Sequence, residues 1–233
     1  MTTIQDNLKH LRDLITESEQ KFGRQPQSVQ LLAVSKTKPI SAIEQAITAN
    51  QTCFGENYVQ EGIEKVDYFR NHHPNLPLTW HFIGPIQSNK TRPVAERFDW
   101  VHTIDREKIA KRLSEQRPES MSPLNVLIQV NTSLEAAKSG VTSQEVLPLA
   151  HFIASQPNLK LRGLMSIPAN VENYQQQKAA FSHLSEQFRA LQAHYPEVDT
   201  LSMGMSGDLQ AAIECGSTIV RIGTALFGAR DYR

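Results

Sequence analysis

Short apolar runs recur along the chain and alternate with longer segments in which apolar residues return every three or four positions. The runs occupy residues 31–35, 52–55, 78–83, 100–104, 125–131, 159–167, 199–203 and 218–222. Their shortness and the turn residues around them predict strands that are buried on both faces, as in a parallel sheet.

The segments between these runs carry the period of a helix. The clearest helical candidates are residues 40–49, 59–69, 109–113, 145–153, 174–191 and 209–214. A further amphipathic segment at about residues 2–22 precedes the first run, and Gly23 and Pro26 are typical stop signals for such a helix.

Strands that alternate with helices form βαβ units and a parallel sheet. Eight such units in a chain of 233 residues match a barrel fold that typically needs about 250 residues. We therefore predict an α/β fold, a single (β/α)8 TIM barrel with an extra N-terminal helix. The predicted single domain covers residues 1–233, with the helix at about 2–22 and the barrel at about 28–233. A doubly wound open sheet is the alternative.

The composition excludes several classes of protein. Lys and Arg number 24 and Asp and Glu number 24, so the chain lacks the basic excess of a nucleic-acid binder. No apolar stretch approaches the roughly 18 residues that span a bilayer, and the start of the chain lacks a secretory signal. Two cysteines are too few for a disulfide framework, and no metal-ligand motif is found. We therefore expect a cytoplasmic protein with no metal, nucleic-acid or membrane partner.

A barrel builds its active site at the carboxyl ends of its strands, and Lys36 follows the first of them in the sequence LLAVSKTKP. By the two-residue period of a strand, Lys36 points into the barrel if Val34 does. Partial desolvation at an apolar barrel mouth favours the neutral amine, which forms a Schiff base with an aldehyde. The alternative is a solvated lysine that ends a strand.

The ends of the seventh and eighth runs read LSMGMSGD and VRIGTALFG. Glycines at positions 204, 207 and 223 let the backbone approach a ligand closely, and Ser206 and Thr224 add hydroxyl donors. The loops after strands seven and eight of a barrel frequently bind phosphate. Ordinary turn chemistry is the alternative, because Gly and Ser are common in tight loops.

Among the polar residues inside the apolar runs, Arg221 and His81 are of chemical interest. Arg221 is flanked by Val220 and Ile222 in the eighth run, and a permanent charge in such a strand needs a partner. That partner is either a structural ion-pair acid or an acceptor on a ligand. His81 lies in the third run, and the period there does not decide which face of the strand it occupies.

Six segments, in order along the chain, match motifs of one known family. They are LLAVSKTKP, FGENYVQE, WHFIGPIQSNK, LRGLMSIP, GMSGDLQAAIECGST and VRIGTALFGAR. The set closely resembles the pyridoxal phosphate homeostasis family, which is related to the N-terminal barrel domain of alanine racemases. The resemblance extends from about residue 23 to residue 230, nearly the whole chain.

This resemblance implies that the protein binds pyridoxal 5′-phosphate (PLP) as its cofactor, through a Schiff base on Lys36. It also implies that Arg221 faces the pyridine nitrogen and that Asn57 lies near the ring. The phosphate would be held by the residues Ser206, Gly223 and Thr224. No catalytic residue is implied.

The function implied by the resemblance is intracellular PLP homeostasis, in which the protein holds and releases PLP without substantial turnover. An arginine opposite the pyridine nitrogen disfavours the protonated ring that makes PLP a strong electron sink. Racemisation also needs two bases on opposite faces of the substrate, and the tyrosines here match no racemase base motif. The alternative is a PLP-dependent amino-acid racemase or a related enzyme of low activity. A more distant alternative is a barrel aldolase that uses Lys36.

We expect PLP as the small-molecule partner and PLP-dependent apoenzymes as candidate recipients. A monomer is expected, because the chain ends after the eighth βα unit and the racemase partner domain would then be missing. Lys38 or Lys138 is hypothesised to accept PLP transiently during exchange, and the alternative is that these are solvated lysines.

Overall fold

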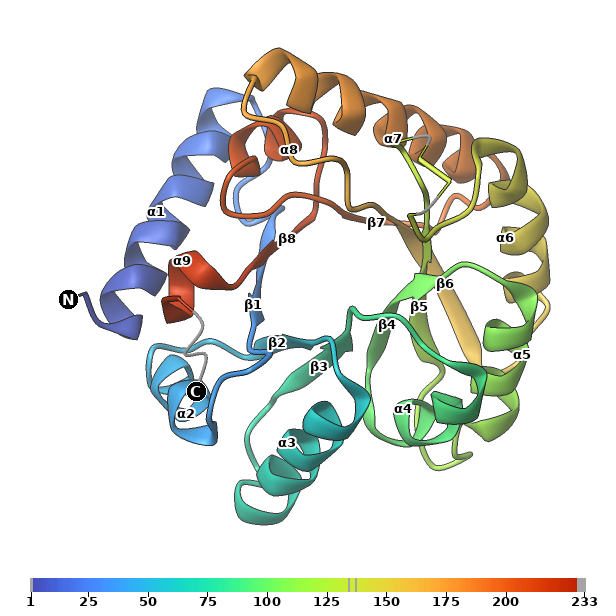
Figure 1. Cartoon of the computed structure of the whole chain (residues 1–233), viewed down its shortest axis with the longest axis horizontal. Coiled ribbons are helices and arrows are strands. Elements are labelled where there is room, and N and C mark those ends of the chain that lie inside the picture. The colour runs from blue at the N-terminus through green and yellow to red at the C-terminus, as the bar shows by residue number, and fades with distance from the viewer. Residues whose placement is uncertain (1, 134, 137, 230–233) are drawn as a thin grey trace.

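The computed structural model describes residues 2–133, 135–136 and 138–229, so the end of the predicted barrel domain lies outside the described residues. Strands β1 to β8 form a closed parallel barrel in sequence order (Figure 1). They are β1 Gln30–Val34, β2 Cys53–Glu56, β3 Thr79–Phe82, β4 Trp100–Ile104, β5 Leu124–Gln129, β6 Leu159–Met165, β7 Thr200–Ser202 and β8 Ile219–Ile222. The barrel prediction is confirmed, and the open sheet is wrong because β8 pairs with β1.

Helices cover the outside of the barrel, as the alternation of periods predicts. They are α1 Ile4–Lys21, α2 Ile40–Thr48, α3 Val59–His72, α4 Thr91–Arg97, α5 Glu107–Gln116, α6 Val146–Ala154, α7 Tyr174–His194, α8 Leu209–Glu214 and α9 Thr224–Phe227, with short 3-10 helices at Ser88–Lys90 and Ser143–Glu145. Periodicity does not single out α4, whose first turn contains Pro93. Proline is tolerated there because the first N–H groups of a helix have no intrahelical partner.

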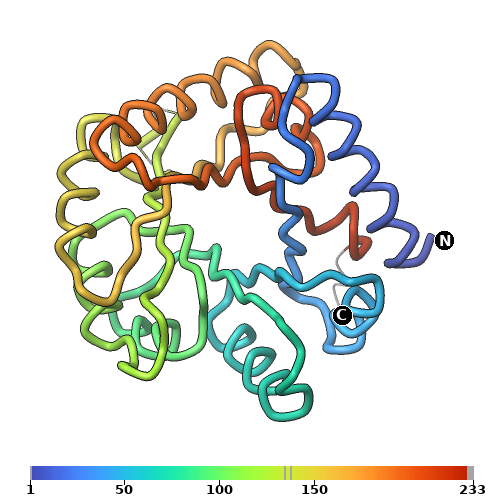
Figure 2. Tube along the Cα trace, turned by 180° about the vertical axis from the view of Figure 1, so that it is seen from behind, coloured from blue at the N-terminus to red at the C-terminus, as the bar shows by residue number. Residues whose placement is uncertain are grey.

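The extra N-terminal helix α1 belongs to the outer ring of helices. It begins with a capping box, in which Asp6 N–H donates to Thr3 Oγ1 at 3.0 Å and Thr3 N–H donates to the Asp6 carboxylate. Its buried face carries Leu8, Leu11 and Ile15, and it packs against α2, α8 and α9 (Figure 1 and Figure 2). Because α8 has six residues and α9 has four, α1 covers barrel surface that these short helices leave open. Within the described ranges, no helix is long and apolar enough to cross a membrane.

The barrel interior has an apolar side and a polar side. A hydrogen bond of 2.9 Å joins His102 on β4 to Ser202 on β7, and it crosses the interior because these two strands are not neighbours. The apolar side is a small cluster that is separate from the main core between strands and helices. Its members are Leu32, Val34, Cys53, Ile83 and Ile219.

Candidate functional site

A cavity of about 400 Å³ opens at the carboxyl ends of the strands. Parallel strands bring their carboxyl ends to the same end of the barrel, so residues far apart in the sequence meet there. All six residues predicted from the sequence line this cavity, which we call the mouth cavity. Its lining is Val34, Lys36, Asn57, Ile83, Ile167, Met205, Ser206, Gly207, Arg221, Gly223 and Thr224.

Lys36 reaches the mouth cavity from the turn that follows β1. Val34 and Lys36 both line the cavity, as the two-residue period predicts, and Lys36 is half-buried. Lys38 N–H closes the turn by donating to Ser35 O at 3.1 Å. Thr37 has a φ of 64°, in the left-handed region that residues with a branched side chain rarely adopt. The turn therefore holds an unfavourable backbone conformation directly beside Lys36.

The loop after β7 forms a second part of the wall. Met205 N–H donates to Asp208 Oδ1 at 2.7 Å, and Asp208 N–H donates to Met205 O at 3.3 Å. These bonds close a turn with Ser206 and Gly207 at its exposed tip. Burial raises the pKa of the Asp208 carboxyl. A Cβ added at Gly207 would meet no atom within 4 Å, so packing does not require glycine at this position.

The loop after β8 passes close to the end of β1. A Cβ added at Gly223 would lie 3.5 Å from Val34 Cβ and from Val34 O. Thr224 follows, and it is exposed beside the cavity. This packing brings the hydroxyl group of Thr224 to the same cavity as the Lys36 amine.

Arg221 is the buried cation of the cavity wall. Its side chain donates from Nη1 to Ser202 Oγ at 2.7 Å and from Nη2 to Ser166 O at 2.8 Å. Burial lowers the pKa of the guanidinium to about 10, and the nearby Asp208 opposes this shift. A guanidinium has five N–H donors, and the two bonds to neutral oxygens fix its plane. Neither of these bonds is to a carboxylate, and the role of Arg221 towards an acceptor on a ligand stays a prediction.

A chain of hydrogen bonds continues from Arg221 across the interior. Ser202 Oγ lies 2.9 Å from His102 Nδ1, and His102 Nε2 lies 2.9 Å from His81 Nδ1. Burial lowers the pKa of His81 to about 3 and that of His102 well below its usual value, so both rings are neutral. Periodicity did not place His81 and does not single out His102 or Ser202. Their common signal is a buried polar residue within a strand.

Asn57 follows β2 and lines the cavity beside Lys36. Its Oδ1 is buried and has no hydrogen-bond partner among the described residues. An unsatisfied buried acceptor of this kind is normally completed by water or by a ligand. The cavity wall therefore offers an amine, hydroxyl groups and a buried cation, and the lining residue Asn57 has an oxygen without a partner among the described residues.

Lys38 and Lys138 do not line the mouth cavity. Lys38 Nζ donates to the carbonyl oxygens of Gly228 at 3.2 Å and Ala229 at 2.8 Å. Lys138 Nζ lies 3.5 Å from Glu135 Oε2. Their hypothesised part in cofactor exchange stays a prediction.

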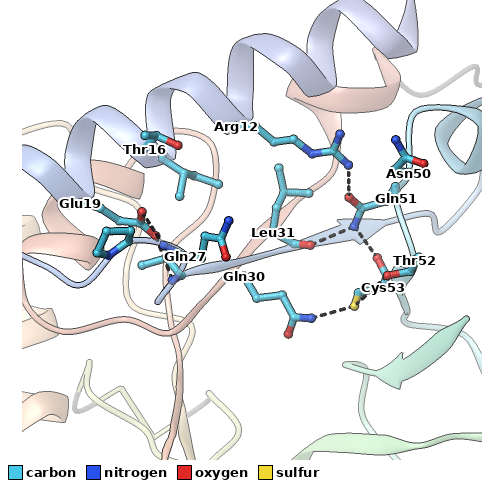
Figure 3. Close-up of a pocket in the computed structure, with 13 residues that line it drawn as sticks. Arg12, Thr16, Glu19, Gln27, Gln30, Leu31, Asn50, Gln51, Thr52 and Cys53 are labelled. Atoms are coloured by element: carbon cyan, nitrogen blue, oxygen red, sulfur yellow. Dashed lines mark hydrogen bonds between the residues drawn. The ribbon is translucent and has the colours of Figure 1, made fainter. Parts of the chain in front are cut away.

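A second cavity, of about 470 Å³, lies at the amino ends of β1 and β2, beneath α1 (Figure 3). Glu19 accepts hydrogen bonds from Gln27 N–H at 3.1 Å and Val29 N–H at 3.0 Å. Arg12 donates to Ala49 O and to the side-chain oxygen of Gln51. We call it the amino-end cavity. Its two charged side chains are held by groups of the protein itself.

Known proteins resemble this chain along nearly its whole length. The family described as alanine racemase, N-terminal domain, matches residues 3–231. The pyridoxal phosphate homeostasis protein of Vibrio cholerae is 66% identical over 232 residues, which cover 100% of this chain and 98% of that protein. The pyridoxal phosphate homeostasis protein of Escherichia coli K12 is 54% identical over 235 residues, with 100% and 99% covered. The chain belongs to the pyridoxal phosphate homeostasis family.

Solved structures place the pyridoxal phosphate homeostasis family within a wider fold group. The structure of PipY from Synechococcus elongatus with PLP bound has a TM-score of 0.78 and 35% sequence identity, covering 92% of this chain and 100% of PipY. Alanine racemase from Corynebacterium glutamicum has a TM-score of 0.69 at 17% identity, covering 97% of this chain and 61% of that one. The racemase likeness shows that the two proteins share the barrel fold.

Proposed function

We propose that this protein binds PLP in the mouth cavity as an intracellular PLP homeostasis protein. It holds PLP as a Schiff base on Lys36 and releases it without substantial catalytic turnover. The observation that carries the proposal is that the Lys36 amine, the hydroxyl-bearing loops after β7 and β8 and the Arg221 guanidinium line one cavity. Relatives named for PLP homeostasis at 54% identity or more, and a PLP-bound relative, support it.

The residues of the mouth cavity fit the chemical groups of PLP. Lys36 supplies the amine for the aldehyde, and Arg221 lies in the wall where it can donate to the pyridine nitrogen. Asn57, with its unsatisfied oxygen, lies near the ring. The phosphate is held by Ser206, Gly223 and Thr224. The apolar side chains of Val34, Ile83 and Ile167, which also line the cavity, would supply apolar contacts for the ring.

The chemistry of attachment needs only the amine and the aldehyde. The Lys36 nitrogen forms a C=N bond with the aldehyde carbon, and the aldehyde oxygen leaves as water. Addition of water, or displacement of Lys36 by a second amine, reverses the attachment. Met205, Ser206, Gly207 and Thr224 at the cavity edge are exposed, which leaves a route for the second amine.

Arg221 supports storage rather than turnover. Even with a pKa lowered to about 10, the guanidinium stays charged at neutral pH and has no lone pair to accept a proton. It therefore disfavours a protonated pyridine ring, and PLP would supply little of the electron-sink chemistry on which racemases depend. The alternative function, a racemase of low activity, would need a second base on the opposite face of the substrate.

The proposal has a cellular part. The protein acts in the cytoplasm as a monomer, with residues 1–233 as one PLP-binding domain, and PLP-dependent apoenzymes receive the released cofactor. The exposed position of Ser206, Gly207 and Thr224 at the edge of the mouth cavity supports exchange there. Gel filtration and PLP transfer to a purified apoenzyme test these statements directly.

The central test is the absorption spectrum of the purified protein after incubation with PLP. We expect a yellow Schiff-base band that borohydride bleaches, and peptide mass spectrometry should locate the reduced pyridoxyl group on Lys36. A wild-type protein that stays colourless would overturn the proposal. Sustained racemisation of an amino acid by the clean protein would instead favour the enzyme.

A further inference from the structure

The turn that carries Lys36 is tied to a buried group of charges outside the mouth cavity. Lys65, on α3, has a side chain that is 6% exposed. Its ammonium donates to Ser35 O, to Glu56 Oε1 and to Glu61 Oε1, each at 2.7 Å. We call Glu56, Glu61 and Lys65 the charge cluster. All three donors of the ammonium are used by these bonds.

The charge cluster contacts the residue on each side of Lys36. Ser35 Oγ donates to Glu56 Oε1 at 2.7 Å, and Thr37 N–H donates to Glu61 Oε1 at 2.5 Å. Thr37 is the residue with a φ of 64°. Because this conformation is unfavourable for threonine, it needs bonds such as the one that Thr37 N–H donates to Glu61 to hold it.

The charge cluster also includes the residue that precedes Asn57, another residue of the cavity lining. Glu56 is the last residue of β2 and directly precedes Asn57. Gly62, on the first turns of α3, packs so closely that a Cβ there would lie 3.3 Å from Glu56 Cβ. The cluster therefore connects α3 to the chain on both sides of Lys36 and to the residue before Asn57.

Stability alone does not account for this arrangement. The Glu56 side chain is fully buried, burial raises the pKa of its carboxyl, and its Oε2 has no partner among the described residues. Replacing a buried ion pair by apolar residues is often neutral or stabilising, because desolvation of the charges opposes their attraction. What charged hydrogen bonds supply in addition is geometry, since they act only over short distances and in defined directions.

We propose that Glu56, Glu61 and Lys65 are positioning residues that hold the turn at residues 35–37 so that the Lys36 amine is presented to the mouth cavity. The inference rests on the proposed function, because it concerns the amine that attaches PLP. The phosphate-binding residues lie on the loops after β7 and β8, away from α3. The cluster therefore governs attachment to Lys36 and leaves phosphate binding unchanged.

The experiment separates attachment from binding with two probes. PLP reports both, by its Schiff-base absorbance. Pyridoxine 5′-phosphate has the same ring and phosphate but an alcohol in place of the aldehyde, so it reports binding without attachment. The decisive variant is Glu61→Ala, which removes the acceptor of Thr37 N–H. Glu61→Gln restores an oxygen acceptor at the same place.

For Glu61→Ala we expect the equilibrium constant of Schiff-base formation to fall on the order of tenfold to a hundredfold. A small misplacement of two reacting groups has an effect of about this size. The dissociation constant of pyridoxine 5′-phosphate should change by less than about twofold. Glu61→Gln should recover most of the loss. Glu64→Ala is the matched control, because Glu64 is an exposed residue of the same helix whose carboxylate accepts from Gln60.

Ser35→Ala provides a second variant if Glu61→Ala does not fold, since it removes one hydroxyl and keeps every charge of the cluster. It should weaken attachment in the same direction by a smaller factor. Unchanged attachment in the folded variants, or equal weakening of both probes, would overturn the inference. A wild-type protein that binds neither probe overturns the proposed function instead, so the two failures are distinguishable.

Discussion

The two cavities lie at opposite ends of one barrel and have similar volumes, about 400 Å³ at the mouth and about 470 Å³ at the amino end. At the amino end, Arg12 and Glu19 bind groups of the protein, mainly the main chain. At the mouth, Ser206 and Thr224 lie on exposed loops and Asn57 has an unsatisfied oxygen. Volume therefore does not distinguish a binding site from a structural gap, whereas the partners of the polar groups do.

The direction of the strands explains this difference. Loops that follow the strands of a barrel are free to present side chains and main-chain groups to a ligand, while the opposite end contributes to stability. The comparison predicts that changes at the two ends have opposite effects. Changes at the mouth should alter PLP binding and spare stability, and changes at the amino end should do the reverse.

Lys36→Ala should have the largest effect on binding. We expect complete loss of the Schiff-base band and of borohydride labelling, because no other residue of the cavity lining carries a primary amine. Thermal unfolding should stay close to that of the wild type, since Lys36 is only half-buried. Stoichiometric labelling of another lysine in this variant would contradict the assignment of Lys36 as the residue that attaches PLP.

Glu19→Ala should have the largest effect on stability. The Glu19 side chain is buried and accepts from the N–H groups of Gln27 and Val29. Leaving these donors unsatisfied should lower the free energy of unfolding by about 2–4 kcal/mol, measured by urea unfolding of the PLP-free protein. PLP affinity should not change. Glu17→Ala, at an exposed position of the same helix, is the control and should leave both quantities unchanged.

The histidines between the two ends predict a dependence of stability on pH. His81 and His102 are neutral because burial lowers their pKa values, that of His81 to about 3. Below about pH 6.5, the unfolded chain binds protons that the folded chain does not. Stability should therefore fall as the pH decreases from 6.5 towards 3, by up to about 1.4 kcal/mol per pH unit for each histidine.

Urea unfolding at pH 7 and pH 5 measures this slope. His102→Asn should reduce it, whereas His10→Asn, at an exposed position, should not. An unchanged slope in His102→Asn would show that other groups carry the acid sensitivity.

Thr224→Val should have the smallest effect. It keeps the shape of the side chain but removes a hydroxyl from the mouth cavity, and loss of one hydrogen bond to a charged phosphate costs about 1.5 kcal/mol. PLP should bind about tenfold more weakly, with stability unchanged. Pyridoxal, which lacks the phosphate, serves as the control ligand in titrations and should bind both proteins equally. Equal weakening of pyridoxal would contradict a phosphate role for Thr224.

Much of the architecture could be predicted from local pattern. The eight apolar runs lie on β1 to β8, with ends that differ by up to about two residues. Val34 and Lys36, which the two-residue period puts on the same face, both line the mouth cavity. Helix α4 was not singled out, because its seven residues are too few to carry several helical periods and Pro93 lies among them.

The charge cluster and the histidine chain could not be predicted in the same way. Lys65 lies thirty positions from Ser35, and His102 lies one hundred positions from Ser202. Each residue alone looks like a surface lysine or an isolated polar residue in a strand. Their partners are brought together only when the strands close into a barrel.

The sequence by itself therefore determined the eight strands, their order and the strand ends at which Lys36, Ser206, Arg221 and Thr224 occur, because these depend on residue spacing along one strand or loop. Only the tertiary structure decided which polar groups share a cavity, which are consumed by the main chain and which are buried without a partner. Those properties depend on distances between strands that are remote in sequence. Closure of the barrel sets these distances.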